Sequence, residues 1–207
     1  MKSPSVTGKA SGPKMRTRRL LDETARELLR TGAPLTVQAV ASLAGVSRAT
    51  AYRYFPTNES VVLHATQPFI DNSFATANDL LDPTNVPSDD VASRAAQLVR
   101  AMGEWAFDHE MELRRMLELS LSPAAVGFEP RGAYTNRAHW IATLLEALPN
   151  DVPPLAHERL AAALTALFGA DAIVWTTDIA GLTREDALNL LEWMARSLVE
   201  ATLSERS

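Results

Sequence analysis

The sequence predicts an all-α protein of about nine helices, because apolar residues recur with the three- and four-residue spacing of amphipathic helices. A second observation is that no stretch of useful length alternates apolar and polar residues as a half-buried strand does. A third is that proline and glycine cluster at a few short breaks, which divide the 207 residues into segments of helical length. No internal repeat is present.

The N-terminal segment is expected to hold a mobile arm and one helix. Residues 1–14 contain Ser, Gly, Pro and Lys without an apolar pattern, and are predicted to be a disordered basic arm. A helix is expected from about Arg16 to Arg30, and Gly32 and Pro34 end it. The residues expected on its buried face are Leu21, Ala25, Leu28 and Leu29.

Residues 36–59 are predicted to form two short helices joined by a tight turn. The first helix has an apolar face made of Val37, Val40, Ala41 and Ala44. Gly45 suits the left-handed backbone that ends a helix, and Ser47 stands where an N-cap oxygen would accept from the second helix. That second helix, 48–54, is short and polar, and it stops before Pro56. The arrangement is a helix-turn-helix, whose second helix is typically the one that enters a DNA major groove.

Further helices are expected at about 57–81, 88–109, 111–121, 133–148, 156–178 and 184–203. Thr57 is the predicted cap of the first of these. Pro68 lies inside it and predicts a kink, because proline lacks an N–H and its ring collides with the carbonyl of His64. The expected breaks are 82–87, 122–123, 129–132, 149–154 and Gly181.

Charge is divided unevenly along the chain. Residues 1–56 contain ten Lys or Arg and three acidic residues, a net charge of +7, whereas the remainder contains ten basic and 22 acidic residues, a net charge of −12. The whole-chain charge of −5 would argue against nucleic acid. The division instead predicts a basic segment for phosphates on an acidic body. For the basic tail by itself, an ordinary solvated surface is the alternative.

Several classes of protein and site are not supported. Cysteine is absent, which excludes disulfides, thiolate metal sites and cysteine nucleophiles. The basic N-terminus does not resemble a secretory signal, and the most apolar stretch, 160–175, is too short to span a bilayer, so a cytoplasmic protein without a membrane partner is expected. There is no phosphate-binding glycine loop or nucleophile elbow. We therefore expect no enzyme, cofactor or metal, although convergence of the four histidines (His64, His109, His139, His157) in space stays open.

The helix-turn-helix carries a specific resemblance. The pattern Ala41-x-x-Ala44-Gly45-Val46-Ser47-x-x-Thr50-x-Tyr52-x-Tyr54-Phe55-x-x-x-Glu59 resembles the DNA-binding domain of the TetR family of bacterial transcriptional repressors, over residues 16–63. One position departs from it, because the family usually has a phosphate-binding Lys where this chain has Asn58. The resemblance implies a helix-turn-helix DNA-binding domain at 15–56 and a helical ligand-binding and dimerisation domain at 57–207.

Twelve residues are candidates for DNA contact. Arg48 and Arg53 are expected to meet bases together with Ala49, since Arg pairs with guanine and Ala touches a thymine methyl. The resemblance assigns phosphate contacts to Ser47, Thr50, Tyr52 and Tyr54. Thr36 would present helix N–H groups to a phosphate, Lys14, Arg16 and Arg18 would add contacts from the arm, and Asn58 keeps a hydrogen-bond donor. For the two tyrosines the alternative is packing, and Val46 and Phe55 are expected in the core.

The C-terminal segment is expected to dimerise, because one short recognition helix grips a half-site weakly and a two-fold dimer fits a pseudo-palindromic operator. Helix 184–203, with a capping box at Thr183 and Asp186, has an apolar face made of Ala187, Leu190, Leu191, Met194, Leu198 and Ala201. Helix 156–178 has another made of Leu160, Leu164, Leu167, Phe168 and Trp175. These faces are predicted to form the dimer interface, with ordinary core as the alternative.

A pocket for a small apolar or aromatic ligand is the second expectation from the resemblance. One helix carries Leu98, Met102, Trp105 and His109 on a single stripe, and residues from other helices that would oppose it are Phe74, Met116, Trp140 and Leu144. The alternative is plain core. Asp171 shares an apolar face and has three interpretations: an ion pair across the dimer, a ligand contact, or a place at the solvent edge.

The functional hypothesis is a dimeric repressor that a small apolar or aromatic ligand releases from its operator. In this hypothesis the ligand lies between the helix containing Pro68 and the helix containing Trp105, and the long helix beginning at Thr57 then moves. A ligand-independent dimeric DNA-binding regulator is the alternative. A helical enzyme with a vestigial DNA-binding segment is the third and least supported.

Overall fold

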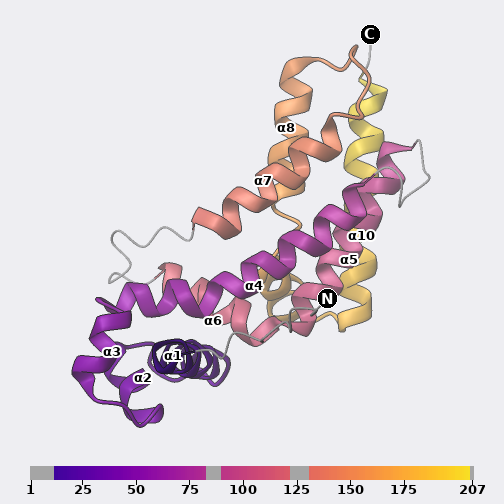
Figure 1. Ribbon diagram of the computed structural model, residues 1–207. Coiled ribbons are helices and arrows are strands. Elements are labelled where there is room, and N and C mark those ends of the chain that lie inside the picture. The colour runs from indigo at the N-terminus through magenta and orange to yellow at the C-terminus, as the bar shows by residue number, and fades with distance from the viewer. Residues whose placement is uncertain (1–11, 83–89, 122–130, 206–207) are drawn as a thin grey trace, which may run out of the picture. The chain divides into compact units, whose positions relative to one another are not determined.

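The computed structural model describes residues 12–82, 90–121 and 131–205, except the side chains of Phe74, Ser120 and residues 131–136 (Figure 1). No strand occurs in these ranges, in agreement with the all-α prediction. The elements in order are α1 Pro13–Arg30, α2 Val37–Leu43, α3 Arg48–Tyr54, α4 Asn58–Leu81, α5 Val91–Asp108, α6 Glu110–Leu121, α7 Arg131–Leu145, α8 Pro154–Thr165, α9 Ala170–Ile173, the π-helix η2 Val174–Ile179 and α10 Arg184–Ser204.

The chain divides into two compact units, unit 1 at Met1–Gln67 and unit 2 at Pro68–Ser207. The division falls inside α4, later in the sequence than the domain boundary expected at residues 56 and 57. One helix therefore belongs to both units. Pro68, the first residue of unit 2, has no N–H to donate to the carbonyl of His64. The kink expected there stays a prediction.

Unit 1 packs α1, α2, α3 and the first half of α4 around a small core. Leu21, Val37, Phe55 and Val61 are fully buried in it. The helix α1 begins at Pro13, earlier than the Arg16 expected, because proline suits the first helical position. Lys14 thus belongs to a helix and not to the predicted disordered arm, whose residues 1–11 lie outside the described residues.

The turn of the helix-turn-helix has the expected chemistry. Gly45 has a φ of +65°, the left-handed conformation that ends α2. The hydroxyl of Ser47 accepts from the amide of Thr50 at 3.1 Å and so caps α3. Phe55 then stops α3 and is fully buried, as predicted, whereas Val46 is only half-buried.

Unit 2 is built around α5 and α10, which pack along each other (Figure 1). Arg100 of α5 ties them together at the surface, with nitrogens 2.8 Å from a carboxylate oxygen of Glu185 and 3.2 Å from one of Glu192. Most residues of the two apolar stripes predicted for the dimer interface are instead buried inside a single chain. The buried members are Leu160, Leu164, Leu167, Phe168, Ala187 and Leu191. This part of the prediction is wrong, because these side chains form the core of unit 2.

The single helix expected at 156–178 is also wrong. The helix α8 ends at Thr165, and the following elements α9 and η2 run at 72° to it. Gly169 has a φ of +86°, which breaks the helix at a position where other residues would be strained. The side chain of Arg137 lies next to this glycine.

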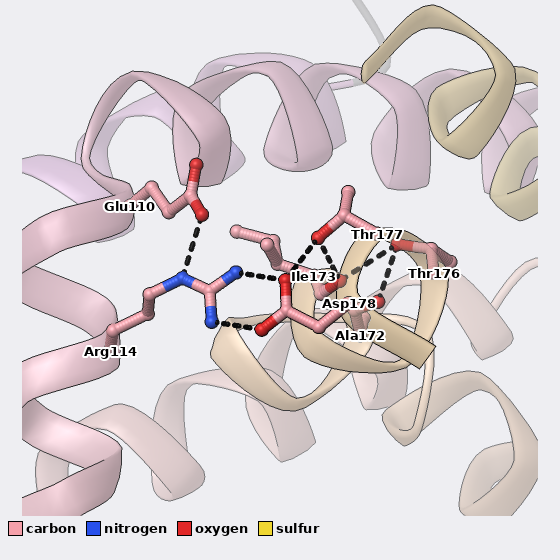
Figure 2. Close-up of polar contacts among 7 residues, drawn as sticks. All are labelled: Glu110, Arg114, Ala172, Ile173, Thr176, Thr177 and Asp178. Atoms are coloured by element: carbon pink, nitrogen blue, oxygen red, sulfur yellow. Dashed lines mark hydrogen bonds and ion pairs between the residues drawn. The ribbon is translucent and has the colours of Figure 1, made fainter. Parts of the chain in front are cut away.

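The π-helix η2 is held against α6 by a polar cluster (Figure 2). Arg114 of α6 donates two hydrogen bonds to the carboxylate of Asp178, at 2.6 and 2.7 Å, and one to Glu110 at 2.7 Å. The hydroxyls of Thr176 and Thr177 donate to carbonyls of Ala172 and Ile173 in the preceding turn. Figure 2 shows Arg114 reaching from α6 to Asp178 near the end of η2. The bidentate geometry makes this a fixed contact between the two elements.

We also examined the described helices for length and hydropathy. None of them taken singly is both long and apolar enough to cross a membrane. Only the bent pair Pro154–Thr165 and Ala170–Ile179 meets these criteria, and only in combination.

Candidate functional sites

The outward face of α3 is the first candidate site. Ala51 is fully buried and anchors the inner face. The side chains on the outer face are exposed: Arg48, Ala49, Tyr52 and Arg53. Tyr52 has half of its surface exposed. The structure therefore brings the expected base-contact residues together on one solvent-facing side.

Backbone amides at the starts of α2 and α3 are partly occupied by caps. The hydroxyl of Thr36 accepts from the amide of Ala39 at 3.1 Å, and Ser47 and Thr50 share a hydroxyl contact of 2.9 Å. The hydroxyls of the two N-cap residues, Thr36 and Ser47, are thus each positioned at the start of a helix. A phosphate at either point would meet a hydroxyl and the remaining N–H groups of the first turn.

Tyr54 has an internal role. It is half-buried, and its hydroxyl donates to the carbonyl of Lys14 at 3.2 Å, which joins α3 to the start of α1. The guanidinium of Arg53 lies over its ring at 5.3 Å from the centroid. The packing alternative thus describes Tyr54 better than Tyr52, although the hydrogen bond of Tyr54 to Lys14 is solvent-exposed.

Arg18 also has internal partners. Its Nε lies 3.0 Å from a carboxylate oxygen of Asp22, its Nη2 is 3.0 Å from the His64 ring, and its guanidinium lies 5.7 Å from the centroid of Phe55. Burial, followed by the charge of Arg18, lowers the pKa of His64 and favours the neutral ring as an acceptor. We therefore leave Arg18 out of the DNA surface proposed below.

Asn58, the departure from the family pattern, joins two helix starts. Its side-chain oxygen accepts from the amide of Val37 at 3.0 Å, so the first residue of α4 caps the first turn of α2. A Lys side chain has no acceptor and cannot make this bond. The substitution exchanges a cation for a structural contact next to the recognition helix.

The basic residues of unit 1 fall into two groups. Arg19 pairs with Glu23 and Arg30 with Glu27 on the surface of α1. Within the described residues, no acidic partner is found for Lys14, Arg16, Arg48 or Arg53. Two of these exposed cations lie on α3, and the other two lie in the first turn of α1, whose Lys14 carbonyl contacts Tyr54 of α3. Positive charge of this kind suits a polyanion.

The second candidate site is a cavity in unit 2, with a volume of about 40 Å³. Four residues predicted for a pocket line it: Met102, Trp105, Met116 and Trp140. The remaining lining consists of Phe69, Ile70, Ser73, Ala106, Leu113, Arg137, Phe168 and Gly169. The wall is thus mainly apolar and aromatic, with few polar groups, as is typical of ligand pockets.

The other predicted pocket residues lie elsewhere. His109 stacks on Trp105, with centroids 4.7 Å apart, and donates to the Trp105 carbonyl at 2.8 Å, so it supports the wall from behind. Leu98 and Leu144 are buried in the main core. Phe74 lies outside the described side chains. Asp171 does not line the cavity, and half of its side chain is exposed.

Arg137 is the functional candidate that sequence reasoning missed. It is 9% exposed, and its two terminal nitrogens lie 3.2 and 3.3 Å from the carboxylate oxygens of Asp171 in the same chain. Asp171 therefore lies at the solvent edge, the third of its three interpretations. It also forms an ion pair, but with an Arg of its own chain. A sequence signal existed, since Arg137 stands three residues before Trp140 and shares its helix face.

The described residues contain no group of three His, Asp or Glu side chains arranged as metal ligands. The histidines His64 and His109 instead have the aromatic and backbone partners given above.

Comparison with known proteins gives one sequence match, which covers the segment that contains the first candidate site. Residues 20–65 match a family model described as bacterial regulatory proteins, tetR family. No curated protein matches the chain in sequence. The matched segment contains α2 and α3 in full, with the turn between them.

Solved structures resemble the chain as a whole. A tetR-family transcriptional regulator from Streptomyces coelicolor is 17% identical, with a TM-score of 0.61 over 94% of this chain and 84% of that one. The multidrug binding protein EbrR, complexed with imidazole, is 21% identical, with a TM-score of 0.55 over 88% and 90%. The TetR-like regulator LfrR from Mycobacterium smegmatis, in complex with proflavine, is 21% identical, with a TM-score of 0.51 over 90% and 97%. At these identities the likeness shows the fold alone.

Proposed function

We propose that the chain is a sequence-specific repressor, which a small apolar or aromatic ligand releases from its operator. The proposal rests on the match of residues 20–65 to the tetR-family model and on a fold like that of solved regulators of this family. The observation that carries the proposal is the exposed face of α3. This face combines Arg48 and Arg53, which have no acidic partner in the described residues, with a capped helix start.

On DNA, α3 enters the major groove with Arg48, Ala49 and Arg53 toward base edges. Ser47, Thr50 and Tyr52 contact the phosphate backbone from the same helix, and Thr36 from the start of α2. Lys14 and Arg16 contact phosphates from the first turn of α1. Two copies of the chain bind the two halves of a pseudo-palindromic operator, since one short helix gives a small interface.

The homodimer proposed here uses surface that the core leaves uncovered. Trp193 of α10 is 62% exposed, and Trp175 and Ile179 of η2 are 45% and 74% exposed. Large apolar side chains exposed in this number are typical of a protein interface. Sedimentation of the wild-type chain is expected to give a dimer, and Trp193→Asp with Ile179→Asp to give a monomer that binds operator DNA more weakly.

DNA binding is tested by selecting duplexes from a random pool and measuring their affinity by fluorescence anisotropy. We expect an enriched palindromic sequence, bound at least 1,000-fold more tightly than random duplex, and an affinity that falls steeply with salt. Equal affinity for selected and random duplexes would contradict the proposal. Arg159→Ala serves as the control, because Arg159 is exposed and paired with Glu205 at the far end of the sequence.

The effector proposed here occupies the unit 2 cavity. Phe69 and Ile70 of its wall follow directly after Pro68 on α4, the helix that begins in unit 1. A ligand that displaces these residues therefore acts on a helix shared with the DNA-binding unit. A coupling of 1–3 kcal/mol, about 5–150-fold in DNA affinity, is the usual size of such an effect. The cytoplasm, where the operator lies, is the location that follows from this role.

The alternative, a ligand-independent dimeric regulator, has one observation in its favour. A cavity of about 40 Å³ holds a few waters, much less than a drug-sized ligand needs. Titration of the protein–operator complex with a set of small aromatic molecules separates the two. Release of DNA by a compound that also quenches the fluorescence of Trp105 and Trp140 supports the repressor, and the absence of any such compound supports the alternative.

A further inference from the structure

Two of the residues that line the unit 2 cavity carry nitrogen donors. Arg137 is buried and charged, and it is the one charged residue among the described lining residues. Trp140 is 4% exposed, and its indole Nε1 has no hydrogen-bond partner among the described residues. A buried N–H without an acceptor costs free energy, because water would have bonded it in the unfolded chain. The wall thus contains positive charge and an unused donor next to an apolar surface.

The guanidinium of Arg137 occupies the space left by the missing side chain of Gly169. A Cβ atom on Gly169 would lie 1.8 Å from Nη2 of Arg137 and 2.7 Å from its Cζ, so any other residue here would force the guanidinium to move. The same glycine breaks the helix between α8 and α9 with its left-handed φ of +86°. The guanidinium of Arg137 therefore packs against the backbone of Gly169 instead of lying in water, and Arg137 lines a mainly apolar cavity.

The contact between Arg137 and Asp171 is longer than a comparable ion pair in the same unit. Its nitrogen–oxygen distances to Asp171, 3.2 and 3.3 Å, are longer than the 2.6 and 2.7 Å between Arg114 and Asp178 in the same unit. Charge-assisted hydrogen bonds are usually 2.7–2.9 Å long. Asp171 also has 49% of its side chain exposed, so water replaces Arg137 readily as its partner.

Resting on the function proposed above, we propose that the effector is an aromatic carboxylate. Its ring lies among Phe69, Trp105 and Phe168, and its carboxylate displaces Asp171 from Arg137. The carboxylate also accepts a hydrogen bond from Nε1 of Trp140. Asp171 thus competes with the ligand carboxylate for the guanidinium of Arg137.

The charge of the wall distinguishes an acid from other aromatic ligands. A cationic ligand would meet Arg137 with no acidic side chain among the described lining residues to offset the repulsion. A neutral ligand with an acceptor would satisfy Trp140 but would not replace the charge of Asp171. An acid does both, and removing the carboxylate of Asp171 should favour it further.

The test uses the full chain and three probes of one shape: cinnamate, cinnamamide and cinnamylammonium. Binding is measured by calorimetry and by tryptophan fluorescence at pH 7. We expect cinnamate to bind at least tenfold more tightly than cinnamamide, and cinnamylammonium to bind most weakly. Trp140→Phe is expected to weaken cinnamate about threefold.

Two further variants test the roles of the ion pair. Arg137→Gln is expected to abolish the preference for the acid while leaving cinnamamide bound. Asp171→Asn is expected to tighten cinnamate at least threefold and to change cinnamamide less than twofold. Circular dichroism checks that each variant is folded, and if Arg137→Gln is not, Asp171→Asn alone decides.

Equal binding of the three probes, an acid preference that survives in Arg137→Gln, or no binding of cinnamate by wild type or Asp171→Asn would each overturn the inference. None of these outcomes touches the proposed repressor, which fails separately if no compound releases the operator.

Discussion

The arginines of the two units have different surroundings. In unit 2, Arg100, Arg114, Arg137 and Arg184 each contact a carboxylate on another element of the fold. In unit 1, the described ion pairs join neighbours within α1, and Arg48 and Arg53 on α3 have no acidic partner in the described residues. Cations in unit 2 therefore hold elements together, whereas those on α3 are the ones that the proposed function assigns to DNA. The following predictions test this difference.

The largest effect is expected from Arg48→Ala with Arg53→Ala. Each base contact contributes about 1–3 kcal/mol, so operator affinity should fall at least 100-fold, measured by anisotropy. The melting temperature should change little, since neither side chain holds the fold. A large loss of stability with operator affinity retained would contradict the contrast between the two units.

A smaller effect is expected from Gly169→Ala, which probes the seat of Arg137. The new methyl group clashes with the guanidinium and the backbone is strained, so the free energy of unfolding should fall by about 2–3 kcal/mol in urea titrations. Gly181→Ala is the matched control, because Gly181 has a φ of +70° with nothing within 4 Å of the new Cβ. Its loss should be about 1 kcal/mol, from backbone strain alone. Equal losses of unfolding free energy in the two variants would mean that the side chain of Arg137 moves aside without destabilising the fold.

Asn58 tests whether unit 1 depends on a polar contact at its edge. Asn58→Ala removes the acceptor of the Val37 amide and should lower the stability of the chain by about 0.5–1.5 kcal/mol. Asn58→Asp keeps an acceptor, so it should retain stability while its negative charge weakens operator binding. The two variants thus separate folding from DNA affinity, and a loss of stability in both would show that the amide nitrogen matters instead.

The smallest effect is a pH dependence in unit 2. Hydrogen bonds from Arg114, with a smaller contribution from Thr177, lower the pKa of Asp178 below its ordinary value. A lowered pKa in the folded state means that the unfolded chain binds the proton more tightly, so the stabilisation is present at neutral pH and is lost as the pH falls through the acidic range. Asp178→Asn should flatten this part of the stability profile, and a profile identical to wild type would contradict it.

Local signals in the sequence were sufficient for unit 1. Gly45, Ser47 and Pro56 act on residues close to them in sequence, so the turn, the cap and the end of α3 follow from the sequence alone. The contact between Asn58 and Val37 did not follow, because it joins residues 21 positions apart whose side chains carry no pairing signal.

Unit 2 was predicted less well, and for a physical reason. An apolar stripe has the same spacing whether it faces its own chain or a second copy, so Leu164 and Leu191 gave no sign of which surface covers them. Gly169 was overlooked as a helix break because a single glycine inside an apolar segment is often tolerated in a helix. Its φ of +86° and the close approach of Arg137 are both features of the fold that the sequence does not reveal.

The small volume of the unit 2 cavity has a consequence for the speed of the response. A guest with an aromatic ring exceeds 40 Å³, so side chains such as Phe69 and Met116 must move before it enters. Entry then waits on this opening, and association is slower than diffusion would allow. In stopped-flow experiments the observed rate should level off at high ligand concentration. The time a cell needs to lift repression would then be set by the rate at which the cavity opens rather than by how often the ligand collides with the protein.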